Sequence, residues 1–164
     1  MSSSAPFLMP STAAAAIADE VRRYGEEILE TGGFLLGPKG SQEITVLAFA
    51  GQIGILRSWG LFQVHELALD RLFGFADDRG LSIPAQFHSH MLRDELSPTD
   101  REHGLRVEEF ISAVVPEYRM PPCDPAKWGW WRFDRDQWVR IGAATTGPGG
   151  VEIVEFDRGG VRAR

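Results

Sequence analysis

Two histidines and an aspartate in the middle of the chain have the types and the spacing of metal ligands. His88 and His90 flank one serine at the end of an apolar segment, and Asp100 follows ten residues after His90. In an extended strand, residues two apart project from the same face, so the two imidazoles are expected side by side. Two imidazoles and one carboxylate leave a fourth tetrahedral position for water, which is the composition of a catalytic zinc site.

Each half of this pattern also has an ordinary explanation. Most His-x-His pairs are surface or packing histidines, and the Ser-Pro-Thr-Asp segment that ends at Asp100 is typical of a helix start, with Ser97 or Thr99 as N-cap. Their joint occurrence is more specific, because the chain has only four histidines. A non-haem iron site uses the same ligand types, but it usually has a carboxylate where this chain has His90.

Helical and strand patterns alternate irregularly along the sequence, which favours an α+β fold with a mixed central sheet flanked by about three helices. Helices are expected over residues 11–29, 66–78 and 99–110. Strands are expected over residues 34–36, 44–49, 61–64, 83–90, 111–115, 128–133, 137–141 and 151–156. Under this prediction His88 and His90 end a strand, and Asp100 lies at the start of a helix.

The length of 164 residues fits one compact domain. Residues 1–10 are rich in Ser and Pro and are expected to be disordered. Residues 11–157 are expected to form the domain, and residues 158–164 a flexible C-terminal tail.

Composition restricts the partners and the compartment. The net charge of −6 and the pI near 5.2 give no reason to expect nucleic acid or an anionic membrane as the main partner. No segment approaches the length needed to span a bilayer. Cys123 is the only cysteine, so no intramolecular disulfide is possible and a cytoplasmic location is expected.

The pair His88 and His90, followed by Ser97 and Asp100, resembles the signature of the JAB/JAMM (MPN-domain) zinc metalloproteases. That family also has an upstream glutamate followed by a glycine and an apolar strand, and Glu30 with the segment Thr-Gly-Gly-Phe-Leu-Leu-Gly after it matches this element. The resemblance covers nearly the whole domain and is strongest to the compact bacterial members, which accompany E1-like and E2-like proteins in conjugation operons, several of them antiviral.

The resemblance implies a single MPN/JAB-type domain and a role for each of five residues. His88, His90 and Asp100 would bind one Zn²⁺ per chain. Glu30 would act as the general base, taking a proton from the zinc-bound water and passing it to the leaving amine. Ser97 would donate a hydrogen bond to the oxyanion of the tetrahedral intermediate. General chemistry agrees, because a positioned carboxylate and a hydroxyl donor each contribute substantially to amide hydrolysis.

The sequence departs from the family pattern at two points. Met91 stands where the family usually has proline after the second histidine, and six residues rather than seven separate His90 from Ser97. The shorter loop affects the expected placement of Ser97 more than that of the histidines. Asp94 and Glu95 lie within this loop and are interpreted as solvated charges.

The family also implies a substrate class. The expected activity is cleavage after the C-terminal tail of ubiquitin or a ubiquitin-like protein, by deconjugation or precursor processing, with E1-like or E2-like proteins as further partners. Two alternatives remain: processing of a sulfur-carrier protein in cofactor or amino-acid biosynthesis, and a non-catalytic MPN scaffold. Scaffolds normally lose the zinc ligands, which this chain retains.

Four aromatic residues near the C-terminus form a dense group. Strand alternation predicts Trp128 and Trp130 on one face of a hairpin, and Trp131 and Phe133 on the other. Packing of this hairpin on the core is favoured over a substrate-binding role.

Overall fold

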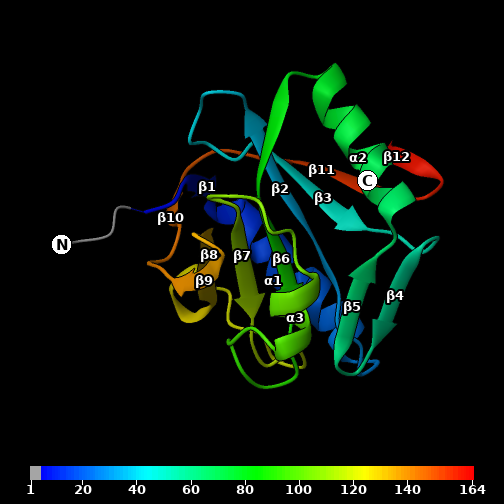
Figure 1. The fold of residues 1–164 in the computed structure, drawn as a ribbon, viewed down its shortest axis with the longest axis vertical. Helices are drawn as coiled ribbons and strands as arrows, with labels where there is room; N and C mark the ends of the chain where they lie inside the picture. Colours follow the sequence, from blue (N-terminus) through cyan, green and yellow to red (C-terminus); the bar gives the residue numbers. More distant parts are fainter. Residues whose placement is uncertain (1–4) are drawn as a thin grey trace.

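The computed structural model describes residues 5–164 and has an eight-stranded mixed sheet at its centre (Figure 1). The strand order across this sheet is β12-β11-β3-β2-β6-β7-β8-β9. The helices are α1 (Ser11–Gly25), α2 (Glu66–Asp78) and α3 (Pro98–His103), with a 3-10 turn at Pro125–Lys127. The strands are β1 (Leu8–Pro10), β2 (Gly32–Pro38), β3 (Val46–Ala50), β4 (Ile55–Ser58), β5 (Leu61–Val64), β6 (Leu81–Ser89), β7 (Ile111–Val115), β8 (Gly129–Asp134), β9 (Gln137–Arg140), β10 (Thr145–Gly147), β11 (Glu152–Asp157) and β12 (Gly160–Ala163).

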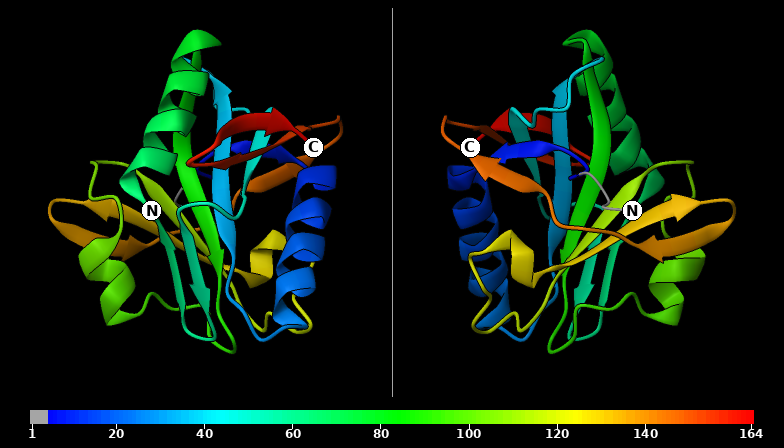
Figure 2. Two further views of the ribbon diagram at one scale, coloured as in Figure 1. Left: turned by 90° about the vertical axis from the view of Figure 1, so that its right-hand side faces the viewer. Right: turned by 90° about the vertical axis from the view of Figure 1, so that its left-hand side faces the viewer.

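The pairing of the strands confirms the α+β prediction and its mixed sheet. Two pairs in the large sheet, β3 with β11 and β6 with β7, are parallel, and the remaining pairs are antiparallel. Two small sheets lie beside it: β1 pairs with β10 in parallel, and β4 pairs with β5 as an antiparallel hairpin. The central strands β2, β3 and β7 are almost entirely buried, because helices cover both faces of the sheet (Figure 2).

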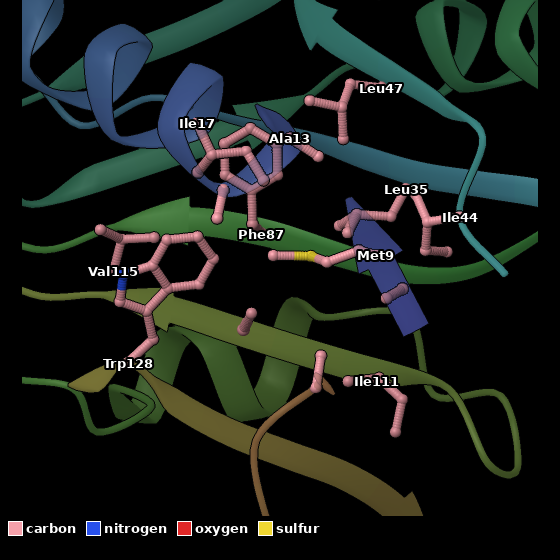
Figure 3. Close-up of a cluster of buried hydrophobic side chains, with 14 of the residues drawn as sticks. Met9, Ala13, Ile17, Leu35, Ile44, Leu47, Phe87, Ile111, Val115 and Trp128 are labelled. Atoms are coloured by element: carbon pink, nitrogen blue, oxygen red, sulfur yellow. The ribbon is translucent and has the colours of Figure 1, made fainter. Parts of the chain in front are cut away.

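Helix α1 covers one face of the sheet. Its apolar stripe, which includes Ala13, Ile17 and Val21, packs on the residues of β2, β3, β6 and β7 that point to that face, such as Leu35 and Phe87 (Figure 3). Trp128 and Trp130 belong to this same cluster. The apolar period of α1 therefore determines which side of the helix faces the sheet.

Helices α2 and α3 lie on the opposite face (Figure 2). There, Ala68 and Leu72 of α2 join a second buried cluster with Phe34, which points to this face of the sheet. Trp131 and Phe133 also belong to this second cluster, which confirms the predicted alternation along the tryptophan strand.

The first helix is shorter than the predicted span of 11–29. It ends at Gly25, where the backbone carbonyl of Tyr118 lies so close that a Cβ on Gly25 would meet it at 1.9 Å. Ile28 then adopts a left-handed conformation with φ of 59°, which turns the chain toward β2. Glu30 consequently lies in the connection before β2 rather than in the helix.

The predicted helix over 99–110 is also too long. The structure has a helix only at Pro98–His103, and Gly104 leaves the helical conformation with ψ of 165°. Glu109 adopts a φ of 71°, and the buried ring of Phe110 packs in the second cluster. Burial of this aromatic side chain thus outweighs the local helical pattern.

Both predictions for the termini need correction. Of the ten residues expected to be disordered, residues 1–4 lie outside the described residues, whereas Leu8–Pro10 form β1 and Met9 is fully buried. The predicted tail at residues 158–164 instead forms β12, which pairs antiparallel with β11.

Among residues 5–164, no helix is long and apolar enough to cross a membrane.

Candidate metal centre

The strands β2 and β6 bring the first candidate residues together at one end of the sheet. Their antiparallel register pairs Gly32 with His88, and the amide of Ser89 donates to the carbonyl of Thr31 (2.9 Å). Glu30 precedes Gly32 by two residues and lies outside this ladder, close enough to the ligand group for the charge of Asp100 to act on it. The end of β6 thus brings both histidines to the side where α3 lies, next to the segment that carries Glu30.

Helix α3 supplies the carboxylate. Ser97 is its N-cap: Ser97 Oγ accepts from the amide of Asp100 (3.0 Å), and the amide of Ser97 donates to Asp100 Oδ2 (2.9 Å). This reciprocal capping box fixes the side chain of Asp100 as well as the helix start. Asp100 Oδ2 lies 3.1 Å from His88 Nε2 and 2.9 Å from His90 Nε2.

The three side chains fit a tetrahedral metal ion. His88 Nε2 and His90 Nε2 are 3.0 Å apart, so the three ligand atoms form a nearly equilateral triangle with Asp100 Oδ2. Zinc bonds of about 2.0–2.2 Å at tetrahedral angles separate ligand atoms by about 3.3–3.6 Å, so these atoms would have to move apart by only a few tenths of an ångström to bind the ion. His88, His90 and Asp100 can therefore hold a metal ion with a fourth position open, and the six-residue loop is long enough for them to converge.

The electrostatics of the site set its two carboxylates apart. Burial by itself would raise the pKa of Asp100, but hydrogen bonds with His88 and His90 outweigh it and hold that pKa well below its usual range. Burial raises the pKa of Glu30 to about 9, and the negative charge of Asp100 adds to this shift. The Glu30 residue is only 4% exposed. A carboxyl group so strongly shifted beside a metal-ligand cluster is typical of a functional site.

Ser97 remains available as a donor despite the shortened loop. Its hydroxyl oxygen accepts from the amide of Asp100, so its own proton is free to point elsewhere. The hydroxyl is partly buried and lies within one helical turn of Asp100. The geometry of the capping box is thus compatible with the oxyanion role that the family resemblance implies.

A groove of about 520 Å³ leads to the metal ligands. Its apolar wall includes Phe34 of β2 and Phe62 of β5, and its other side is formed by α3 and the segment after it. His88 and Asp100 lie in its lining. His65 and His103 also line it. His65 is the N-cap of α2, and its Nδ1 accepts from an amide of that helix (3.2 Å).

Sequence reasoning missed a buried network that holds the glutamate segment. Ser89 Oγ accepts from the amide of Thr31 (2.9 Å), and Thr31 Oγ1 accepts from Arg57 Nε (3.2 Å). The Arg57 guanidinium also donates to the carbonyls of Ala50 and Gly51 (2.7 Å each). Strand β4, which carries Arg57, was not predicted from the sequence. The amide of Glu30 itself donates to the carbonyl of Ser58 in this hairpin (2.9 Å).

The interpretation of Asp94 as a solvated charge is incomplete, because its side chain is 32% exposed but is also paired. Its carboxylate accepts from Arg140 (2.6 Å), and its carbonyl accepts from Trp131 Nε1 (3.2 Å). Both partners lie on the β8–β9 hairpin, more than thirty-five residues away in sequence. Glu95, by contrast, is exposed as expected.

Two solved structures share this fold at low sequence identity, and a third is similar with a lower score. A protein from Desulfitobacterium hafniense has a TM-score of 0.59 at 12% identity, over 91% of this chain and 93% of that chain. A protein from Salinibacter ruber has a TM-score of 0.50 at 22% identity, over 82% of this chain and 91% of that chain. A JAB1/MPN domain protein from Archaeoglobus fulgidus has a TM-score of 0.47 at 13% identity, over 84% and 98%. No family model matches the sequence, and the comparison with curated proteins finds no match.

Proposed function

We propose that this chain is a zinc metallopeptidase of the JAB/JAMM type. The observation that carries the proposal is the convergence of two imidazoles and one carboxylate within 3.1 Å of one another. Glu30 is buried and is affected by the charge of Asp100, and the Ser97 hydroxyl lies at the start of α3. A non-catalytic scaffold would have no need for a buried glutamate beside three such ligands.

In this mechanism, zinc bound by His88, His90 and Asp100 supplies Lewis acidity and lowers the pKa of water to about 7. Glu30 accepts a proton from the attacking water and passes it to the leaving nitrogen. In the metal-free protein burial favours the protonated form of Glu30. A bound cation beside it would lower this pKa, so that Glu30 would be ionised when it accepts the proton. Ser97 Oγ donates its free proton to the carbonyl oxygen as negative charge develops there.

The groove supports an extended peptide as substrate. Its wall is formed by β5, which among residues 5–164 pairs only with β4, so its outer edge offers backbone groups to an added strand. The Phe62 ring narrows the groove near His88. It packs on Gly32, the residue paired with His88, so closely that a Cβ on Gly32 would lie 2.5 Å from the ring. We propose that the substrate is the tail of a ubiquitin-like protein, as a conjugate or a precursor, because a tail with small residues before the scissile bond suits a narrow groove. Its conjugation enzymes would be further partners.

The direct test is incubation of the zinc-loaded protein with ubiquitin-like fusions and, in parallel, with sulfur-carrier protein fusions. Cleavage after the modifier tail is expected, and a metal chelator should abolish it. Glu30→Gln should keep the zinc and lose at least a hundredfold in cleavage rate. Glu66→Gln, an exposed residue of α2, is the matched control and should cleave like the wild type.

The outcomes separate the alternatives. Cleavage of the sulfur-carrier fusion alone would move the substrate class to cofactor biosynthesis while leaving the mechanism in place. Zinc binding without cleavage of either kind of fusion would favour the scaffold. Equal cleavage by Glu30→Gln and the wild type would refute the assigned base.

A further inference from the structure

Helix α3 carries a metal ligand although it is too short to be stable by itself. It has six residues, and none of them is buried. Isolated helices shorter than about 12 residues are marginal in water, so tertiary contacts must hold this one in place. The loop before it, residues 91–96, is anchored in the core only through Leu96, which is 6% exposed. The position of Asp100 therefore depends on what α3 and this loop rest upon.

They rest on the β8–β9 hairpin. The guanidinium groups of Arg101 in α3 and Arg140 in β9 both lie over the ring of Trp131, at 5.2 and 5.1 Å from its centroid. Arg140 also forms a two-point ion pair with Asp94 of the loop (2.6 and 3.4 Å). Such stacked and forked contacts are specific to arginine geometry.

Two further contacts fix the loop and the helix against the same hairpin. The carbonyl of Asp94 accepts from Trp131 Nε1 at 3.2 Å and approaches Gly129 so closely that a Cβ there would lie 1.9 Å away. Trp138 Nε1 donates to the carbonyl of Arg101 (3.4 Å), and the Trp138 ring lies against Gly104 at the end of α3. One hairpin thus contacts the loop, the first turn of α3 and the C-cap residue that follows the helix.

We propose that Trp131, Trp138 and Arg140, together with Asp94, are positioning residues for the metal ligand Asp100. None of the four belongs to the candidate metal ligands, and none of them lines the groove itself. They act by holding a marginal helix at the distance from β6 at which Asp100 meets the two histidines. This inference rests on the proposed zinc site, and it adds to that site a function for the tryptophan hairpin beyond core packing.

The chain offers a matched control for the ion pair. Arg79 and Glu152 form a similar two-point pair (2.7 and 2.8 Å) with similar exposure, 42% and 44% against 47% and 32% for Arg140 and Asp94. Arg79 also stacks on an aromatic ring, at 5.0 Å. That pair joins the end of α2 to β11, away from the metal ligands.

The experiment measures zinc affinity by chelator competition. Arg140→Gln and Asp94→Asn should each weaken zinc binding about tenfold, as loss of groups that orient ligands typically does. The double variant should be little weaker than either single one, because both act through the same contact. Arg140→Lys should recover part of the affinity, and Arg79→Gln and Glu152→Gln should stay within about twofold of wild type.

A second readout needs no metal. Amide exchange in the metal-free protein reports on α3 through Arg101 and Gly104, whose amides donate to the carbonyls of Ser97 (3.0 Å) and Asp100 (2.9 Å). Arg140→Gln should exchange these amides several-fold faster than Arg79→Gln.

These two readouts separate the inference from the proposed function. Unchanged zinc affinity in Arg140→Gln and Asp94→Asn, or equal weakening in the Arg79 and Glu152 controls, would overturn the inference. If the wild type binds no zinc, the proposed function fails and the exchange measurement alone decides: faster exchange supports the positioning role, and unchanged exchange overturns it.

Discussion

Glu30 is a carboxyl group that the fold keeps away from water. The metal-free folded protein holds a proton there, because burial and the charge of Asp100 raise the pKa of Glu30 to about 9. The unfolded chain releases that proton near its ordinary pKa of 4.5. The contribution of this group to stability is therefore full below about pH 4.5 and decreases as the pH rises toward 9.

Glu30→Gln is accordingly expected to stabilise the metal-free protein at pH 8, because the amide needs no proton to be neutral. We expect a gain of about 2 kcal/mol in the free energy of unfolding at pH 8. Near pH 4.5 the two proteins should unfold alike. Urea unfolding at both pH values measures this difference. A wild type more stable than the variant at pH 8 would contradict the assigned environment.

Asp157 shows the opposite behaviour at the residue scale. Hydrogen bonds from Arg162, and then from the amides of Gln52, Gly159 and Ile53, outweigh its burial and hold the pKa of Asp157 far below its usual range. Its stabilising effect is present above the unfolded pKa of about 4 and is lost as the pH falls toward the folded value.

Asp157→Asn should therefore lower the free energy of unfolding by about 2 kcal/mol at pH 7. The difference from wild type should shrink as the pH falls from 4 to 2, since the wild-type carboxylate then loses its own advantage. Denaturant unfolding across this range measures the gap. A gap that stays constant down to pH 2 would mean that the charge of Asp157 contributes nothing.

At the scale of elements, the β4–β5 hairpin depends on one arginine. Arg57 donates to the carbonyls of Ala50 and Gly51 and to Thr31, and its guanidinium stacks on the ring of Tyr24 at 4.1 Å. It therefore links the groove wall to α1, to β3 and to the segment that carries Glu30. Among residues 5–164, no other residue of this hairpin forms hydrogen bonds to as many parts of the fold.

Arg57→Lys keeps the positive charge but removes the guanidinium group that donates to several acceptors at once. We therefore expect the β4–β5 hairpin to be held less firmly against the rest of the fold. The free energy of unfolding should fall by about 2 kcal/mol, and amides in the β4–β5 ladder should exchange faster than those of β7. Hydrogen exchange followed by NMR distinguishes this from general destabilisation. Arg22→Lys, on the exposed side of α1, is the control; equal exchange in the two variants would argue against the linking role.

The elements that sequence patterns predicted well are those whose period is set locally. Strands β5 and β7 and helix α2 have the predicted bounds, because the strands are short apolar runs and the helix has an amphipathic pattern, both of which can be read locally. Helix α3 was predicted too long, because burial of Phe110, a tertiary effect, ends the helical pattern. The short terminal strands β1 and β12 were missed, since each is stabilised by a partner strand that local sequence does not reveal.

The same distinction applies to the site. His88, His90 and Asp100 were predictable because they belong to one strand-loop-helix segment with a recognisable spacing. The groups that hold this segment were not. Arg140 lies 46 residues from Asp94, and no local pattern reveals a pair at that separation.

At the scale of the whole molecule, the C-terminal strand closes the fold onto the first helix. Arg164 donates to both oxygens of Glu20 (2.7 and 2.8 Å), a pair separated by 144 residues in sequence. Glu20 is 4% exposed; burial would raise its pKa, but the hydrogen bonds and charges of Arg164 and Arg23 lower it below the ordinary value. Arg164 also lies over the ring of Phe49 (5.0 Å), so it joins α1, β3 and the sheet edge.

Arg164→Ala should therefore leave a buried carboxylate with one partner fewer and destabilise the protein as a whole. We expect a loss of about 2 kcal/mol in the free energy of unfolding, below the full value for a buried pair because Arg23 still contacts Glu20 (3.0 Å). Glu20→Gln in the same background should recover part of this loss, because the uncompensated charge is then absent. Urea unfolding of the two single variants and the double variant measures both effects. Zinc affinity should stay within about twofold of wild type. The Arg164–Glu20 pair lies on the α1 side of the sheet, whereas the proposed metal ligands lie on the α3 side. A larger change in affinity would show that the two faces are coupled through the sheet.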